Sequence, residues 1–169
     1  MPAPYRVLFV CTGNSCRSQM AESIMRHVGG ERFIAASAGS HPAGVISQLA
    51  VETMKAMNIS MEGQTSKSWD AFLGTPQDVI ITVCDSAAAT PCPNYPGQPV
   101  SAHWSLPDPT FLAGPEPHRL ALARHVAEKL KTACEALAEL PLDELTPDNL
   151  RAKLMELAPD TSDFRPPVG

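Results

Sequence analysis

The sequence predicts an α/β fold in three layers: a four-stranded parallel sheet flanked by helices, with an extra short C-terminal helix and tail. Short β-branched apolar runs, typical of buried parallel strands, recur along the chain. They alternate with longer segments in which apolar residues recur at helical spacing. The chain has 169 residues, 44% of them hydrophobic, which suits one domain with a sizeable core.

The first strand is predicted at residues 7–10, and a helix begins near Ser18, from which apolar residues keep helical spacing as far as Val28. Gly29 and Gly30 give a C-cap signal for this helix. The other strands are expected at residues 33–38, 79–84 and 102–104. The other helices are expected at residues 45–57, 115–140 and 150–157, with one helical turn at 69–73.

Residues 1–140 are predicted to form the main domain, and residues 141–169 a helical extension that is not an independent domain. Within the extension, Thr146 is placed as an N-cap and Pro147 as the first helical residue. We expect a packing helix followed by a solvated tail.

The loop between the first strand and the first helix is the most informative stretch of the chain. Gly13 and Asn14 tolerate the positive φ angles of a tight loop. Backbone N–H groups of such a loop form an anion-binding nest, whose field favours the thiolate of Cys11 as a nucleophile. Arg17 follows six residues later and can grip two oxygens of a tetrahedral oxyanion, while Ser18 can donate to the thiolate.

Residues 11–22 read CTGNSCRSQMAE and resemble the signature of the low-molecular-weight tyrosine phosphatase superfamily, most closely the arsenate reductases that share that fold. The resemblance implies a P-loop in which Cys11 attacks an arsenate or phosphate oxyanion. It also implies the residues that bind the oxyanion, which are Thr12, Gly13, Asn14, Ser15, Cys16 and Arg17.

Two further cysteines follow the strand predicted at 79–84. Cys84 ends that strand, near the first loop if the two strands are neighbours, and Cys92 follows on a loop. The pair resembles the redox pair of thioredoxin-coupled arsenate reductases, with seven residues between the cysteines, one more than is usual there. It implies a thiol relay from Cys11 through Cys84 to Cys92, closed by thioredoxin, glutaredoxin or a low-molecular-weight thiol, with no bound cofactor.

Asp108 lies between two prolines in a stretch that resembles the Asp-Pro loop of the superfamily, which implies the general acid. Protonation of a leaving oxygen needs a carboxylic acid held over the anion site. We expect His103 to pack against the strand end instead of taking part in catalysis.

Some related reductases bind potassium behind the loop with an asparagine, a glutamate, a serine and an aspartate. The matching residues in this chain are Asn14, Glu22, Ser37 and Lys67. We infer that the Lys67 ammonium takes the place of the cation beside Glu22, and no metal ligand is assigned.

The remaining cysteines have plainer interpretations. Cys16 is either a packing residue or a thiol that oxidises onto Cys11, as in related phosphatases. Cys134 lies on the apolar face of the long helix and is expected in the core. A zinc site built from Cys11, Cys16, Cys84 and Cys92 is less favoured, because the usual knuckle spacings are absent.

The composition indicates which classes of partner and which cellular compartment to expect. A formal net charge of −5 argues against nucleic acid and anionic membrane surfaces. The five cysteines fit a reducing compartment, and neither a transmembrane stretch nor a signal peptide is recognised. A cytoplasmic monomer is therefore expected.

Three functions are compatible with the sequence. The first is arsenate reduction. The second is tyrosine phosphatase activity with Cys11, Arg17 and Asp108 alone, although the paired tyrosines often found after the Asp-Pro in phosphatases are absent. The third is a non-turnover oxyanion-binding or redox-sensing module.

Overall fold

The computed structural model describes residues 3–89 and 93–167 and contains a four-stranded parallel sheet. The strands lie in the order β2-β1-β3-β4, so the strand that precedes Cys84 is the direct neighbour of the strand that ends at Cys11, which is the condition under which Cys84 was expected near the first loop. The strands are β1 (Tyr5–Cys11), β2 (Phe33–Gly39), β3 (Val79–Thr82) and β4 (Val100–His103).

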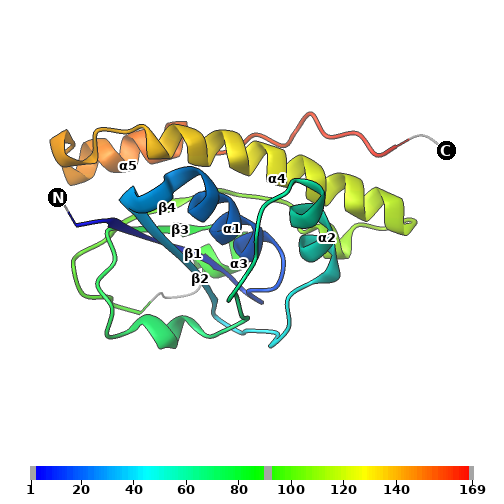
Figure 1. The fold of residues 1–169 in the computed structure, drawn as a ribbon, viewed down its shortest axis with the longest axis horizontal. Coiled ribbons are helices and arrows are strands. Elements are labelled where there is room, and N and C mark those ends of the chain that lie inside the picture. The colour runs from blue at the N-terminus through cyan, green and yellow to red at the C-terminus, as the bar shows by residue number, and fades with distance from the viewer. Residues whose placement is uncertain (1–2, 90–92, 168–169) are drawn as a thin grey trace.

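Helices flank this sheet. The α-helices are α1 (Arg17–Gly29), α2 (Gln48–Ala56), α3 (Asp85–Ala89), α4 (Glu116–Ala138) and α5 (Pro147–Glu156). Short 3-10 helices are η1 (Gly30–Arg32), η2 (Trp69–Phe72), η3 (Pro109–Phe111) and η4 (Leu142–Glu144). Figure 1 shows α1 and α4 together on one side of the sheet and η2 on the other. The predicted three-layer α/β architecture is confirmed.

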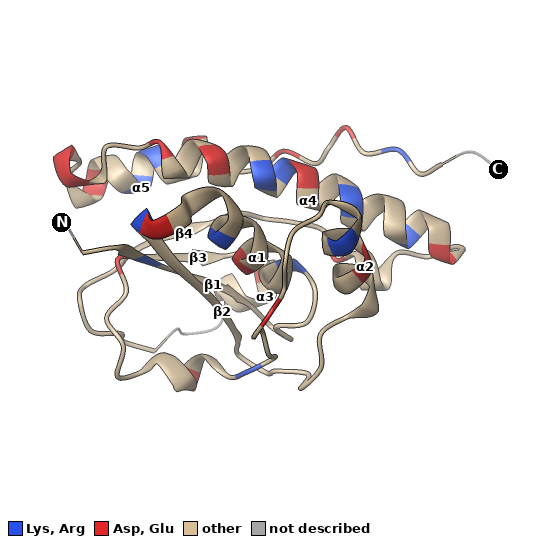
Figure 2. Ribbon diagram, in the orientation of Figure 1, with Lys and Arg blue, Asp and Glu red and all other residues tan. Residues whose placement is uncertain are grey.

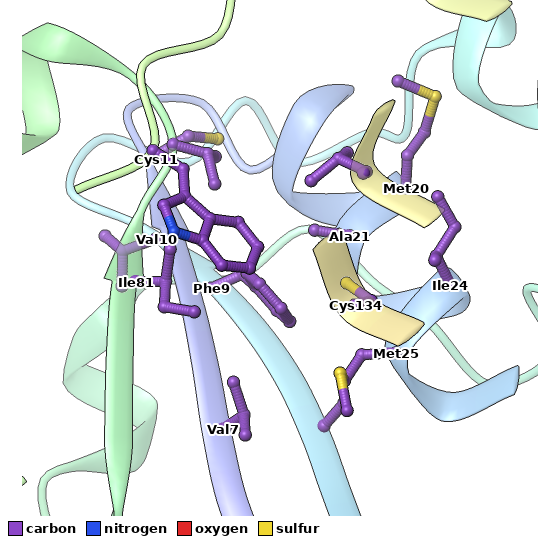
Figure 3. Close-up of a cluster of buried hydrophobic side chains, with 14 of the residues drawn as sticks. Val7, Phe9, Val10, Cys11, Met20, Ala21, Ile24, Met25, Ile81 and Cys134 are labelled. Atoms are coloured by element: carbon purple, nitrogen blue, oxygen red, sulfur yellow. The ribbon is translucent and has the colours of Figure 1, made fainter. Parts of the chain in front are cut away.

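The core lies between β1 and the pair α1 and α4. Residues 7–10 are fully buried, as expected for a central parallel strand with both faces covered. Figure 3 shows Val7 and Phe9 directed toward Ala21 and Met25 of α1 and toward Cys134 of α4. Cys134 is therefore a core residue, as expected.

Most charged residues belong to the helices and loops, and the strands contain few of them (Figure 2). This distribution fits a sheet that is covered on both faces. Within the described part of the chain, no helix combines the length and the apolar character that crossing a membrane requires.

Several predicted elements differ from the structure, and the strand expected at residues 79–84 already ends at Thr82, so Cys84 follows the strand instead of ending it. The helix expected from residue 45 begins at Gln48, because Ser47 caps it through a hydrogen bond from Leu49 N–H. Val45 precedes the helix and is 67% exposed. The stretch directly after Cys84, where no helix was expected, forms the short helix α3.

The C-terminal helix is capped as expected, since Thr146 Oγ1 accepts a hydrogen bond from Asn149 N–H. The chain then returns along α4 (Figure 1), where Asp163 pairs with His125 and Lys129 at 3.0 and 3.2 Å. The boundary at residue 140 remains a prediction, although α5 itself packs against β4.

Candidate active site

The loop after β1 wraps around the sulfur of Cys11. Asn14 adopts a left-handed conformation, with φ of 48°, and its backbone N–H donates to Cys11 Sγ at 3.2 Å. Ser18 Oγ lies 2.9 Å from the same sulfur and accepts a hydrogen bond from Asn14 Nδ2 at 2.8 Å. The Ser18 hydrogen is thus free to point at the sulfur, so the Asn14 N–H and the Ser18 hydroxyl can both donate to Cys11 Sγ.

Asn14 is held in this conformation by a buried network. Its side-chain oxygen accepts from Gln19 Nε2 and from Lys67 N–H, each at 3.0 Å. Gly39 of β2 lies so close that a Cβ would be 2.5 Å from Thr12 O, so a side chain at this position would displace the loop. The loop is therefore pre-formed by its neighbours.

Arg17 connects the loop to the stretch that carries Asp108. Its Nη1 donates to Leu106 O at 2.9 Å, and its Nη2 donates to Asp108 Oδ2 at 3.3 Å. The other carboxylate oxygen of Asp108 accepts hydrogen bonds from the N–H and Oγ1 of Thr110 in η3, which Asp108 caps. The predicted nucleophile, arginine and acid thus converge from segments far apart in the sequence.

A cleft of about 630 Å³ opens over this group. Its walls include the loop residues, the segment around the predicted acid Asp108 (the acid stretch) and the end of β3. Its lining residues are Cys11, Thr12, Gly13, Ser15, Cys16, Arg17, Cys84, Asp85, Ser86, Leu106, Pro107, Asp108, Thr110 and Phe111.

Cys84 shares this cleft with Cys11. It follows β3, is 3% exposed, and its Sγ lies 3.3 Å from Thr12 Oγ1. Ala87 N–H of α3 donates to the same sulfur at 3.4 Å. The second predicted thiol is thus next to the oxyanion loop, while Cys92 lies outside the described residues.

Comparison with known proteins now defines the family. A family model described as low molecular weight phosphotyrosine protein phosphatase matches residues 6–151. The chain belongs to this family. Curated relatives include arsenate reductases from Halalkalibacterium halodurans and Bacillus subtilis, 35% and 34% identical over 133 residues, with 79% of this chain and 94% of each relative covered. A solved structure of an arsenate reductase in the phosphate binding state is 30% identical, with a TM-score of 0.67 over 79% of this chain and 96% of that chain.

Cys16 lies inside the phosphatase-family loop but has a different environment from Cys11. It is 5% exposed, and burial raises the pKa of its thiol to about 12, with the negative charge of Asp108 adding to the effect. A thiol with that pKa stays protonated near neutral pH, so the packing interpretation is favoured over the reactive one. Burial likewise raises the pKa of Cys134.

Lys67 lies behind the loop after β1, the position expected from the resemblance to the related reductases. Its Nζ is 3.9 Å from Glu22 Oε1 and donates to Thr65 O at 2.7 Å. Ser37 Oγ donates to the same Glu22 oxygen at 2.6 Å. Burial raises the pKa of Glu22 and lowers that of Lys67. In the described part of the chain, no cluster of three or more His, Cys, Asp or Glu side chains could hold a metal ion.

Asp85 was missed by the sequence analysis. Its Oδ1 accepts hydrogen bonds from His103 Nε2 at 2.8 Å and from Ser105 Oγ at 2.9 Å, which hold the pKa of this carboxyl below its usual value. These contacts tie the first residue of α3 to the end of β4. Nothing local marks the pair, since Asp85 and His103 are 18 residues apart. His103 thus packs at the strand end, but through polar contacts.

Proposed function

We propose that the protein reduces arsenate to arsenite with Cys11 as nucleophile and Cys84 as the second thiol. The observation that carries this proposal is the position of Cys84, in the same cleft as Cys11 and beside Thr12. A phosphatase needs a nucleophile, an arginine and an acid, whereas a reductase also needs a second thiol within reach. The curated relatives named arsenate reductase support the same conclusion.

In the first step, the loop N–H groups and Arg17 bind arsenate, which has the shape and charge of phosphate. The Cys11 thiolate attacks arsenic, and Asp108 gives its proton to the departing oxygen, which leaves as water. Arg17 must turn from Asp108 toward the oxyanion, so substrate binding also releases the carboxyl from its cationic partner.

In the second step, the Cys84 thiolate attacks Cys11 Sγ. The S–S bond forms as the S–As bond breaks, and the electron pair of that bond passes to arsenic. Arsenic(V) is reduced to arsenic(III), and two thiols are oxidised to one disulfide. Thr12 Oγ1, 3.3 Å from Cys84 Sγ, is placed to donate a hydrogen bond to the attacking thiolate.

In the third step, Cys92 attacks Cys84 and restores Cys11, leaving a Cys84–Cys92 disulfide. An external thiol reductant, of the thioredoxin, glutaredoxin or low-molecular-weight type, reduces that disulfide and completes the cycle. The sequence pair Cys84 and Cys92 supports this step, and mass mapping of the cysteines tests it.

A single turnover tests the proposal. The reduced protein, freed of reductant, is mixed with arsenate and quenched with an alkylating agent. We expect about one arsenite per chain and a disulfide between Cys11 and Cys84 or between Cys84 and Cys92. Cys84→Ser should stop arsenite release, whereas Cys134→Ser, a matched change in the core, should retain it. Arsenite release without a disulfide, or unchanged release by Cys84→Ser, would overturn the relay.

Aryl phosphate hydrolysis is the second candidate function. The contacts that support it are those of Cys11, Arg17, Ser18 and Asp108, which need no further thiol. Hydrolysis by Cys84→Ser at the parent rate, with no arsenite from the parent protein, would assign the protein to hydrolysis instead of reduction.

A further inference from the structure

Trp104 joins the end of the sheet to the C-terminal helix. It follows β4, is fully buried, and its indole Nε1–H donates to Leu154 O of α5 at 2.8 Å. Leu154 lies in the last turn of α5, where carbonyl groups lack helical partners. The hydrogen bond therefore satisfies a buried indole donor and a helix-end acceptor together.

Other contacts fix the two partners of this hydrogen bond. The Trp104 ring packs on Phe9 of β1, with ring centroids 6.2 Å apart. Arg151 Nε, also on α5, donates to Ser101 O of β4 at 3.3 Å. The α5 helix thus contacts β4, the strand that leads into the acid stretch.

Only a short segment separates Trp104 from the catalytic groups. Trp104 N–H donates to Thr82 O, Leu106 N–H donates to Val83 O, and Leu106 O accepts from Arg17. Asp108 comes two residues after Leu106, with Pro107 between them. Proline restricts the backbone of this segment, so few free torsions separate Trp104 from Asp108.

We propose that α5 is a positioning element of the active site, which holds Asp108 over Cys11 through the Trp104–Leu154 hydrogen bond. The family model ends at residue 151, so the acceptor residue belongs to the part of the chain beyond that match. The inference rests on the proposed function only in taking Asp108 as the general acid. Trp104 itself touches no reacting atom.

The test is a double-mutant cycle between Trp104→Phe and Asp108→Asn. Phenylalanine keeps an apolar ring against Phe9 but cannot donate to Leu154 O. We expect Trp104→Phe to lower the limiting rate of arsenite release about tenfold, with the half-saturating arsenate concentration changed less than twofold, since small displacements of positioned groups are costly. In the Asp108→Asn background, Trp104→Phe should change the rate less than twofold, because its effect passes through the acid.

Trp69→Phe is the matched control, since it makes the same substitution in η2, away from the acid stretch, and should retain the parent rate. A tenfold loss that persists in the Asp108→Asn background, or no loss in the single variant, would overturn the proposal. Asp108→Asn alone tests the acid assignment: an unchanged rate would remove the acid from the proposed function.

Truncation provides a second test that keeps the indole. Removal of residues 158–169 leaves α5 in place and should retain activity, whereas removal of residues 147–169 should lower the rate as Trp104→Phe does. In a Trp69→Phe background, Trp104 is the only tryptophan, and its emission should shift to the red only in the longer truncation. Emission and activity equal to those of the parent protein after removal of α5 would contradict the proposal. If this truncation fails to fold, the double-mutant cycle of Trp104→Phe and Asp108→Asn decides the question.

Discussion

Lys67→Met removes the cation that faces the buried carboxyl of Glu22. The two groups lie 3.9 Å apart, and their side chains are 27% and 9% exposed. The variant loses the charge pair and the Nζ hydrogen bond to Thr65 O, but it keeps the backbone N–H that donates to Asn14 Oδ1, so its contact with the loop is retained. We expect it to lower the free energy of unfolding.

The size of the loss follows from the geometry. Two unit charges at this separation attract by about 4 kcal/mol at an effective dielectric constant of about 20. Two effects reduce the net cost: the lysine no longer loses hydration on folding, and Arg26 Nη1 still lies 3.5 Å from Glu22 Oε2. We therefore expect the free energy of unfolding near pH 7.5 to fall by about 1–2 kcal/mol.

The loss should depend on pH with a definite sign. Burial raises the pKa of Glu22 in the folded protein, so between its unfolded and folded pKa the folded state binds more protons. Glu22 therefore makes the protein less stable as the pH rises through that window. Loss of Lys67 raises this pKa further, so the deficit of Lys67→Met should be largest near neutral pH and shrink as the pH falls toward about 4.5.

Urea unfolding of parent and variant, at several pH values and constant ionic strength, measures the effect. Lys153→Met is the control, because its partner Glu156 lies 3.7 Å away on an exposed helix surface; we expect a change below about 0.5 kcal/mol. A Lys67→Met deficit no larger than that of the control, or one that grows as the pH falls, would refute the reasoning. Parent activity that rises markedly with potassium and not with sodium would contradict the substitution of ammonium for a bound cation.

Three further predictions concern the site. Cys11→Ser should lower both arsenate reduction and aryl phosphate hydrolysis by on the order of 10⁴-fold or more, measured in single turnovers and initial rates, and retained turnover would reject this nucleophile. Asp108→Asn should slow phenyl phosphate hydrolysis by roughly 10²–10⁴-fold; an equal rate would reject the acid. Because burial raises the pKa of the Cys16 thiol to about 12, iodoacetamide near pH 8 should leave Cys16 unmodified while it alkylates the proposed nucleophile Cys11; mass mapping measures this, and equal labelling would contradict the raised pKa of Cys16.

The elements that carry a local pattern were predictable from the sequence. The run at residues 7–10 and the Gly13–Asn14 pair specify a buried strand and a tight loop, and the structure has both. Thr146 and Pro147 likewise marked the start of α5. The signal in each case is confined to a few neighbouring residues, which is where sequence patterns are informative.

Contacts between distant segments were not predictable in this way. Arg17 and Asp108 are 91 residues apart, and no periodicity connects Trp104 with a carbonyl of α5. The helix α3 was missed because five residues of Asp, Ser and Ala have no apolar stripe to reveal helical spacing. Its stability depends on contacts such as His103 with Asp85, which exist only after the sheet has formed.

The register of β1 against β3 has a consequence for which insertions and deletions this site can tolerate during evolution. Val10 of β1 pairs with Thr82 of β3. Cys11 comes one residue after Val10 and Cys84 comes two residues after Thr82, so the two thiols lie at the same edge of the sheet. The number of residues between Cys11 and Cys84 does not affect this arrangement. Extra residues at the open turn around Gly63 would leave the thiols where they are, whereas slippage of β3 by a single residue would turn Cys84 to the opposite face. The pair of thiols proposed to react thus tolerates insertion and deletion in the chain that connects it far better than any shift in strand pairing.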